Sequence, residues 1–386
     1  MDTQDGIRIA QTCAGEARDA VREFHEAVAQ PDLALVVFFC SDEYDLGAVA
    51  AEMGERFAGV PVIGCTTAGE IGPAGCRDHS IAGVSMSASV CTAVCGGLER
   101  LHQFTAAEGR ALAHELLDRL DRRSPAPDRR GRFAFMLVDG GSVREEPVAS
   151  AFQEALDDVS LIGGSAGNGL RFGSTYVYVD GRFRPDGAAL VVADTPLPIM
   201  PFKTQHFVPT DERLVVTEAD PVRRIVSEIN GLPAAAEYAR ALGVSESKLG
   251  PSHFASSPVV VLIDGANYVR SIQKVNPDGS LTFFCAIEAG VVLRMARGVD
   301  LVANLDDAFA QVRARIGPPR LVLTCDCILR RLEIVEGGLQ ERVDEILAAN
   351  HAVGFNTYGE QFCGVHINQT LTAIAFGAAR ERRLHG

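Results

Sequence analysis

The amino-acid sequence predicts a mixed α/β (α+β) protein of two domains, built from repeated strand-helix-strand units with glycine-rich turns plus an antiparallel β meander. Two observations predict this fold. A strand-helix-strand pattern that ends in a turn of glycine and small polar residues occurs three times, and a group of short β-rich runs lies between the second and third copies. A chain of 386 residues is long enough for two or three domains.

The three copies share the order of their elements but hardly any residue identity. Copy one has a strand at 35–39, a helix at 46–56, a strand at 61–63, a turn at 64–70 and a strand at 81–86. Copy two has a strand at 133–138, a helix at 147–156, a strand at 160–162, a turn at 163–167 and a hairpin ending at 188–192. Copy three has a strand at 321–324, a helix at 339–349, a turn at 354–360 and a strand at 370–376.

The region between copies two and three has a different character. Turn-forming residues separate β-rich runs at 259–263, 268–275, 280–287 and 290–295, which predicts the antiparallel meander. The stretch 219–249 before it is predicted to be helical, with an interruption at 230–233. We place the domain boundary near residues 215–220. The expected division is therefore an N-terminal helical lead (1–32), a first domain (33–218) and a second domain (219–386).

Composition and charge exclude several classes of function. The formal net charge is −14, so a general nucleic-acid-binding role is not expected, and the basic run at 122–132 is interpreted as a solvated linker. The longest strongly apolar run, 33–40, is too short to span a membrane, and the polar N-terminus does not resemble a signal peptide. The 10 cysteines include no C-x-x-C pair, which disfavours a zinc site. We expect a cytoplasmic protein.

The turn of copy two matches the G-x-S-x-G pattern of a serine hydrolase, with Ser165 as the possible nucleophile. That chemistry needs a helix directly after the turn, whereas residues 168–181 predict a β hairpin. The three turns are instead expected to present backbone N–H groups at the carboxyl ends of strands, where α/β sheets bind ligands. We predict that they converge on one cleft and that Gly64, Thr66, Gly164 and Ser165 line it. Ordinary tight turns are the alternative.

Six segments resemble the FIST N and FIST C domain pair of bacterial sensory proteins, and the resemblance covers residues 33 to 376. They are VVFFCS (36–41), VIGCTTAGEI (62–71), LIGGSAGN (161–168), the stretch at 215–239, CDCILRR (325–331) and GFNTYGEQFCGVHINQTL (354–371). The resemblance implies an input module of signal transduction. The family includes haem-binding nitric-oxide sensors that regulate histidine kinases and cyclic-di-GMP signalling. It thus implies haem as cofactor, a sensor histidine kinase or cyclic-di-GMP enzyme as partner, and leaves a homo-oligomer open.

Haem requires an axial ligand in an apolar pocket. Of the 9 histidines, His206 and His366 have apolar neighbours near the expected junction of the domains, whereas the others lie among charged or loop residues. We predict one of these two as the haem-iron ligand, with the thiolates of Cys327 and Cys363 as alternatives. Either histidine can instead be a hydrogen-bonded structural residue.

Several further polar residues suit ligand binding. Arg270 and Arg330 are candidates for pairing with carboxylates or propionates, because a guanidinium offers a planar fork of donors. Hydrogen bonds to a polar ligand are expected from Tyr358, Glu360, Asn368 and Gln369. For Glu70 and Arg331 we expect surface ion pairs.

Two classes of function remain open. The favoured class is a non-catalytic sensor whose ligand is either haem with nitric oxide or a small metabolite such as an amino acid. The second class is a hydrolase that uses Ser165 or a cysteine as its nucleophile.

Overall fold

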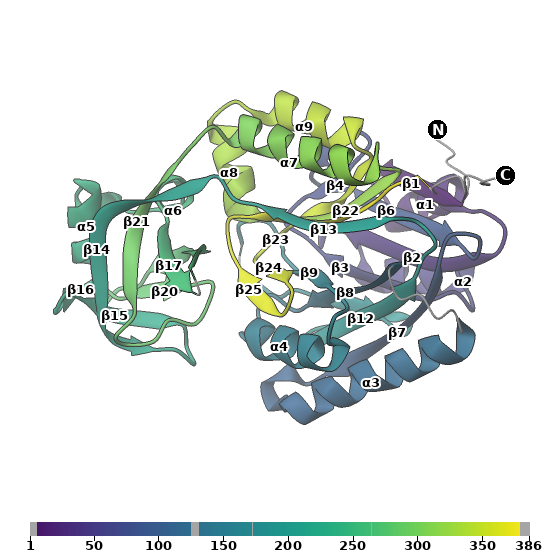
Figure 1. Ribbon diagram of the computed structural model, residues 1–386, viewed down its shortest axis with the longest axis horizontal. Coiled ribbons are helices and arrows are strands. Elements are labelled where there is room, and N and C mark those ends of the chain that lie inside the picture. Colours follow the sequence, from purple (N-terminus) through teal and green to yellow (C-terminus); the bar gives the residue numbers. More distant parts are fainter. Residues whose placement is uncertain (1–5, 125–130, 172, 264, 379–386) are drawn as a thin grey trace, which may run out of the picture.

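Three six-stranded sheets of one design make up most of the molecule, which we describe from a computed structural model over residues 6–124, 131–171, 173–263 and 265–378. The strand orders are β1-β6-β2-β3-β10-β11, β7-β12-β8-β9-β24-β25 and β13-β26-β22-β23-β4-β5. A fourth sheet forms a separate unit at the left of Figure 1. The predicted mixed α/β class is confirmed. Residues 125–130 of the expected linker lie outside the described residues.

The elements fall into three repeats. Repeat one comprises β1 (Ile7–Thr12), α1 (Ala17–Val28), β2 (Leu33–Cys40), α2 (Leu46–Arg56), β3 (Val62–Thr66), β4 (Glu70–Gly72), β5 (Gly75–Arg77) and β6 (Ile81–Ser87). Repeat two comprises β7 (Thr92–Glu99), a 3₁₀ turn (Leu101–Gln103), α3 (Ala106–Arg123), β8 (Arg132–Val138), α4 (Glu145–Leu156), β9 (Leu161–Ser165), β10 (Val177–Val179), β11 (Arg182–Arg184) and β12 (Gly187–Asp194). Repeat three comprises β13 (Ile199–Thr204), α7 (Leu301–Ile316), β22 (Leu321–Cys327), α8 (Ile328–Glu336), α9 (Gln340–Ala349), β23 (Ala352–Thr357), β24 (Glu360–Phe362), β25 (Val365–Ile367) and β26 (Leu371–Phe376).

The repeats exchange hairpins, so that each sheet is completed by another repeat. The β10–β11 hairpin of repeat two pairs with β3, the β24–β25 hairpin of repeat three pairs with β9, and the β4–β5 hairpin of repeat one pairs with β23. Within each sheet the pairs β2–β3, β8–β9 and β22–β23 are parallel. The exchange makes the three sheets one unit, which we call the core.

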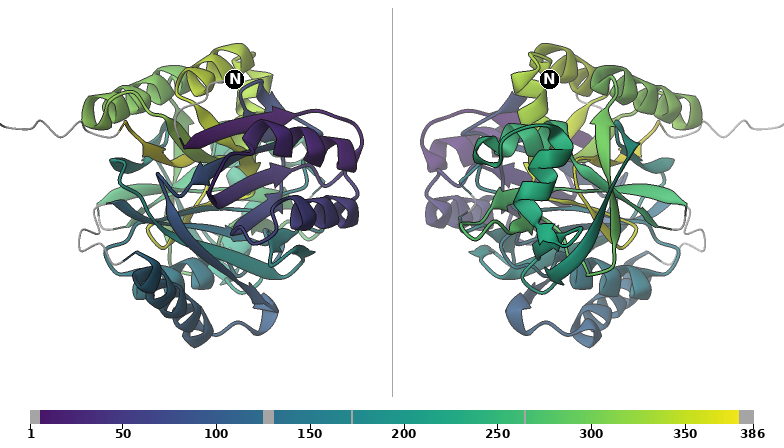
Figure 2. Two further views of the ribbon diagram at one scale, coloured as in Figure 1. Left: turned by 90° about the vertical axis from the view of Figure 1, so that its right-hand side faces the viewer. Right: turned by 90° about the vertical axis from the view of Figure 1, so that its left-hand side faces the viewer.

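The inner faces of the three sheets meet in one hydrophobic cluster. Phe39 of β2 stacks on Phe355 of β23 with ring centroids 4.7 Å apart, and Phe135 of β8 meets Phe39 edge-on. The outer faces are covered by α1 and α2, by α3 and α4, and by α7 and α9 (Figures 1 and 2). Strands such as β2 (LALVVFFC) are therefore buried on both faces, which explains their nearly continuous apolar sequence.

Repeat three contains an inserted domain, residues 207–298, between β13 and α7; it stands in front of the core in the right-hand view of Figure 2. Its elements are β14 (Phe207–Asp220), β15 (Ile225–Ile229), β16 (Leu232–Pro233), α5 (Ala234–Leu242), a 3₁₀ turn (Glu246–Lys248), α6 (Pro251–Ser256), β17 (Val259–Ile263), β18 (Ala266–Arg270), β19 (Ile272–Val275), β20 (Leu281–Phe283) and β21 (Val292–Gly298). The domain has its own hydrophobic cluster. Its two connections to the core lie side by side, since Phe207 pairs with Gly298 and the Val299 N–H donates to the His206 carbonyl.

The structure corrects three expectations about elements. The N-terminal lead is not purely helical, because 7–12 form β1 and join the first sheet through β6. The segment 219–229 is not helical but completes β14 and forms β15, which pair antiparallel; only α5 fulfils the predicted helix. Residues 163–165 are not a turn, since they continue β9. The expected boundary at 218 falls inside β14. No helix in the described part of the chain is long and apolar enough to cross a membrane.

Candidate functional site

The three glycine loops, residues 66–70, 165–169 and 356–360, meet at the carboxyl ends of β3, β9 and β23. Their predicted convergence is confirmed, whereas the cleft that they were expected to line stays a prediction. They contact one another directly through backbone hydrogen bonds, from Gly167 N to Thr66 O (2.9 Å), from Asn356 N to Gly69 O (2.7 Å) and from Ser165 N to Gly359 O (2.9 Å). The loops thus seal the end of the core. The inserted domain packs against this end through a cluster that joins Ala255 and Phe284 to Ala68, Cys327 and Tyr358.

Ser165 is not arranged as a nucleophile. Its side chain is fully buried at the end of β9, and its hydroxyl accepts a hydrogen bond from Gln361 Nε2 at 3.0 Å. The same amide nitrogen lies 3.1 Å from His366 Nδ1, so Gln361 separates the serine from the histidine. A carboxamide cannot take up the hydroxyl proton as a general base. As placed, Ser165 holds the β24 hairpin against β9.

His366 connects the core to the inserted domain. Its Nε2 lies 3.1 Å from the carbonyl oxygen of Phe284, and its Nδ1 accepts from Gln361. Burial lowers the pKa of this imidazole. The contacts are those of a neutral ring that donates from Nε2 and accepts at Nδ1.

His206 lies at the connection into the inserted domain and contacts α8. Its Nε2 is 2.9 Å from both carboxylate oxygens of Glu333, and its Nδ1 is 3.2 Å from Arg330 Nη1. Burial lowers its pKa although Glu333 opposes the shift. Arg330 is fully buried and donates from Nε to Asp326 at 2.7 Å, while its Nη2 has no hydrogen-bond partner among the described residues.

These residues do not fit haem ligation as they are arranged. Both ring nitrogens of His206 and of His366 are engaged by protein groups, which leaves no lone pair for iron. Burial raises the thiol pKa of Cys327 and, less, of Cys363, which disfavours a thiolate at either position. Haem ligation by any of the four stays a prediction that would require rearrangement.

Three of the polar residues predicted to hold a ligand make contacts between the core and the inserted domain. Gln369 donates from Nε2 to the Ala255 carbonyl at 2.6 Å and accepts from Ser271 Oγ at 2.8 Å. Asn368 Oδ1 lies 3.4 Å from Ser271 N, and Arg270 Nη1 lies 3.4 Å from the His366 carbonyl. The stretch from His366 to Gln369 is therefore the core's docking strip for the inserted domain.

Gly64, Thr66 and Gly164 lie within strands and pack rather than line a cavity. A Cβ on Gly64 would come within 2.5 Å of the Phe38 ring, and one on Gly164 within 2.6 Å of the Phe355 ring. The hydroxyl of Thr66 accepts from Tyr176 N at 3.0 Å. Their predicted role as ligand-lining residues is corrected to close packing around the three sheets.

Glu70 is not the surface residue that we expected. Its carboxylate is buried and accepts from Ser80 N and Ser80 Oγ at 3.1 and 2.7 Å. Burial raises its pKa to about 7 against these hydrogen bonds. Glu360 makes the same contacts with Thr370 in repeat three, so both glutamates bind the residue that precedes the last strand of their repeat.

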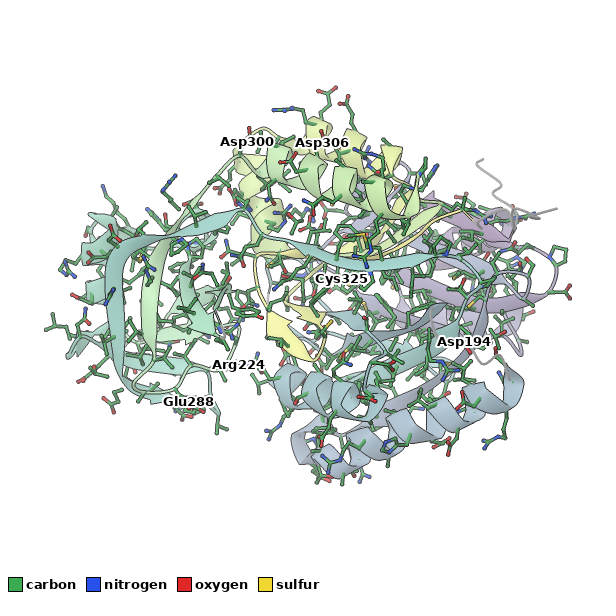
Figure 3. The ribbon with its side chains drawn as sticks, viewed as in Figure 1. Asp194, Arg224, Glu288, Asp300, Asp306 and Cys325 are labelled. Carbon is green, nitrogen blue, oxygen red and sulfur yellow. The ribbon has the colours of Figure 1, made fainter. Side chains whose placement is uncertain are left out.

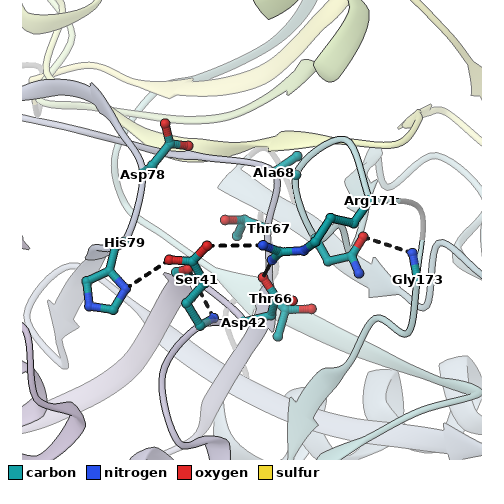
Figure 4. A network of polar contacts seen from close by, with 12 residues as sticks. Ser41, Asp42, Thr66, Thr67, Ala68, Asp78, His79, Arg171 and Gly173 are labelled. Atoms are coloured by element: carbon teal, nitrogen blue, oxygen red, sulfur yellow. Dashed lines mark hydrogen bonds and ion pairs between the residues drawn. The ribbon is translucent and has the colours of Figure 1, made fainter.

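Arg331 does form the expected ion pair, with Asp78 at 2.8 Å. Figure 4 shows the neighbouring polar network with Asp42 and Arg171. Arg171 of repeat two forms ion pairs with Asp42 and Glu43 of repeat one. Arg171 is 54% exposed, and exposed pairs of this kind contribute little to stability. The surface around Arg171, beside the three glycine loops, is therefore an ordinary solvated surface.

A pocket of 190 Å³ lies between the core and the inserted domain. The core supplies Gly140 and Gly141 after β8 and the ring of Tyr358, and the inserted domain supplies Gln273 and Phe284. Of the predicted site residues only Tyr358 lines it, and its hydroxyl is hydrogen-bonded to Asn168 and Gly169.

Arg224, a residue that sequence reasoning missed, anchors this pocket. It extends from the β14–β15 turn on the side of the inserted domain that faces the core (Figure 3). Its Nη2 lies 2.6 Å from the buried Glu145 carboxylate at the start of α4, and it also pairs with Glu146. In the sequence, only the Asp-Gly-Gly turn at 139–141, at the carboxyl end of a predicted strand, indicated that a ligand pocket could lie here. No local pattern marks Arg224.

Comparisons with known proteins agree with the expected family. The FIST N domain model matches residues 34–232 and the FIST C domain model matches residues 234–363, and their boundary falls within the inserted domain. No curated protein matches the chain in sequence. The structure is similar to a chorismatase over 96% of this chain and 98% of that chain (10% identity, TM-score 0.37) and to a cyanuric acid hydrolase from A. caulinodans over 96% and 99% (8% identity, TM-score 0.39). Likeness at this level says nothing about activity. The two domain matches together cover most of the chain, and the protein therefore belongs to the FIST family, whose domains are associated with sensing in signal transduction.

Proposed function

We propose that the protein is a non-catalytic sensory module that binds a small metabolite at the junction between the core and the inserted domain. The observation that carries the proposal is that both units supply walls of the same pocket. A ligand held there contacts both, so its binding free energy depends on how the inserted domain is docked. Such differential contact is what couples ligand binding to a conformational equilibrium.

The size of the pocket supports a ligand of about the size of an amino acid. Pockets for drug-sized molecules measure roughly 300–1,000 Å³. At 190 Å³ the junction pocket is smaller than this range. Haem is too large to fit into a pocket of this volume. Arg223 at its rim and the backbone of Gly140 and Gly141 suit a ligand with an acidic group.

Thermal unfolding in the presence of single amino acids and their keto acids tests the proposal. At least one compound is expected to raise the melting temperature, because a ligand that binds only the folded protein stabilises it. In Gly141→Leu the added side chain fills the pocket, and the effect should disappear. Gly54→Leu on the exposed face of α2 is the control and should respond like the wild type. If the responses of Gly141→Leu and the wild type are equal, the ligand does not bind in this pocket.

Haem-based nitric-oxide sensing is the alternative drawn from the family resemblance. Its test is a hemin titration followed by visible absorption. Binding that produces an intense Soret band, lost in either His206→Ala or His366→Ala, would replace the metabolite proposal. A protein that takes up no hemin leaves the metabolite proposal in place.

A hydrolase is the third candidate, and the buried contacts of Ser165 with Gln361 argue against it. Esterase turnover that is abolished in Ser165→Ala would reverse this choice.

For the sensory role we propose a sensor histidine kinase or a cyclic-di-GMP enzyme as the partner. The measurement is the kinase or cyclase activity of a co-purified partner with and without the ligand found in the thermal screen.

A further inference from the structure

Two cations meet at a second place between the core and the inserted domain. Lys203 lies on β13 of the core, and its Nζ is 4.4 Å from the ring centroid of Tyr268 on β18 and 5.7 Å from that of Phe362 on β24. Arg270 follows Tyr268 by two residues and so projects from the same face of β18. Lys203 and Arg270 thus lie close together beside two aromatic rings.

Neither cation has an acidic partner within the described part of the chain. Lys203 makes no ion pair or hydrogen bond there, and Arg270 reaches only the carbonyl oxygens of Val269 and His366, each at 3.4 Å. Both side chains are half-buried. Burial lowers the pKa of Lys203; Cys363 opposes this shift, and the charge of Arg270 adds to it.

With 50 acidic and 36 basic residues, carboxylates are abundant, and buried arginines such as Arg224 and Arg330 are each paired with one. A cation over an aromatic ring gains only a modest attraction, which does not replace the hydration that a half-buried ammonium loses. Two neighbouring cations without a counter-charge favour an external anion.

We propose that Lys203 and Arg270 form a binding site for a small oxyanion, the carboxylate or phosphate group of a ligand that lies against Tyr268 and Phe362. The guanidinium supplies a planar pair of donors and the ammonium a mobile point charge, a combination suited to either group. The site shares no residue with the 190 Å³ pocket and does not rest on the proposed function. Because Lys203 belongs to the core and Arg270 to the inserted domain, a bound anion fastens one to the other.

Cys363, next to Phe362 at the tip of the β24–β25 hairpin, is an exposed thiol that reports on the site. We would measure its alkylation rate by peptide-resolved mass spectrometry in phosphate, in acetate and in chloride at equal ionic strength. An anion bound at Lys203 covers the hairpin tip and removes the positive charge that favours the thiolate, so phosphate or acetate should slow the reaction several-fold relative to chloride. The exposed Cys13 in the same sample should react at one rate in all three salts. Slower alkylation of Cys363 in phosphate indicates a phosphate ligand, and slower alkylation in acetate indicates a carboxylate ligand.

Three variants and one control make the test specific. The slowing should be lost in Lys203→Gln and in Arg270→Gln and kept in Lys203→Arg, which retains the charge. Arg297→Gln, at an exposed position on β21, is the matched control and should behave like the wild type. The proposal is overturned if neither salt slows alkylation of Cys363 in the wild type, or if the slowing persists in both Gln variants.

Discussion

The guanidinium of Arg224 and the carboxylate of Glu145 form a buried ion pair across the junction, with Nη2 and Oε2 2.6 Å apart. Glu146 and the carbonyl oxygen of Phe284 accept the remaining hydrogen bonds of Arg224. Since Glu145 begins α4 of the core and Arg224 belongs to the inserted domain, this buried pair joins the two beside the pocket.

Arg224→Met should loosen the docking of the inserted domain strongly. Removing one member of a buried ion pair leaves the other charge uncompensated, which typically costs about 3–5 kcal/mol. Hydrogen exchange at β14 and β15 is expected to become faster, while exchange in β2 and β8 stays slow. Arg110→Met removes an exposed pair with Glu154 and should change neither. Equal protection of β14 in the wild type and Arg224→Met would contradict the role of the pair.

Glu70 should make stability depend on pH. Its pKa is about 7 in the folded protein and 4.5 in the reference state, so the folded protein binds the proton more tightly. The resulting stability is fully present below pH 4.5 and is lost as pH rises through 7, by on the order of 3 kcal/mol. Relative to Glu70→Gln, the wild type should therefore lose free energy of unfolding between pH 5 and pH 8 in urea titrations. Parallel pH profiles of the two proteins would show that the carboxyl titrates normally.

His206 should make the connection to the inserted domain sensitive to acid. Its folded pKa is lowered by burial, so its contribution to stability is present above the ordinary histidine pKa and is lost as pH falls through the lowered value. Protonation also places a second positive charge against Arg330, while Glu333 and Asp326 oppose that effect. Limited proteolysis at residues 205–207 should therefore accelerate on acidification, and less so in His206→Gln. An unchanged acid response in that variant would assign the effect to another group, such as His366.

Gly164→Ala should destabilise the core. The new methyl group would lie 2.6 Å from the Phe355 ring and 3.0 Å from Cys325 Sγ, and overpacking of this kind costs about 1–3 kcal/mol. Gly54→Ala is the matched control, since this glycine lies on an exposed helix face with open space around it. That substitution should instead stabilise the protein by about 0.5–1 kcal/mol. Urea denaturation monitored by circular dichroism separates the two signs.

The inserted domain should be removable, whereas a cut at residue 218 should not be tolerated. Phe207 and Gly298 are paired neighbours, so a short turn can replace residues 207–298 without moving β13 or α7. The shortened protein should keep the circular dichroism of the core and lose ligand binding. Fragments 1–218 and 219–386 should each fail to fold, because β13 pairs with β26 and β24 pairs with β9 across the cut. A soluble, cooperatively folding fragment would refute this.

The elements that could be predicted are those that local pattern decides. The apolar run of β2 and the amphipathic stretch of α2 can be recognised from the sequence alone. The strand-rich residues after Ser165 likewise argue against a nucleophile elbow without any structure. The threefold recurrence of one pattern also indicated that the loops converge, because equivalent strands of packed sheets end on the same side. Residues 219–229 were misread, since their pairing partners in the inserted domain outweigh weak local propensity.

The sequence by itself therefore determined the class of fold, the three repeats, the β-rich character of residues 259–295 and the candidate loops. The predicted meander is wrong, because β18 and β19 lie at opposite edges of the fourth sheet and β14 and β15 separate β21 from β20. Tertiary structure alone decided the exchange of hairpins between repeats and the burial of Glu70. It also decided the pairing of Arg224 with Glu145, which lie 79 residues apart, and of His206 with Glu333, 127 residues apart. The physical reason is that hydrophobic periodicity is written into neighbouring residues, whereas the partner of a buried charge is fixed only when distant segments pack and exclude water.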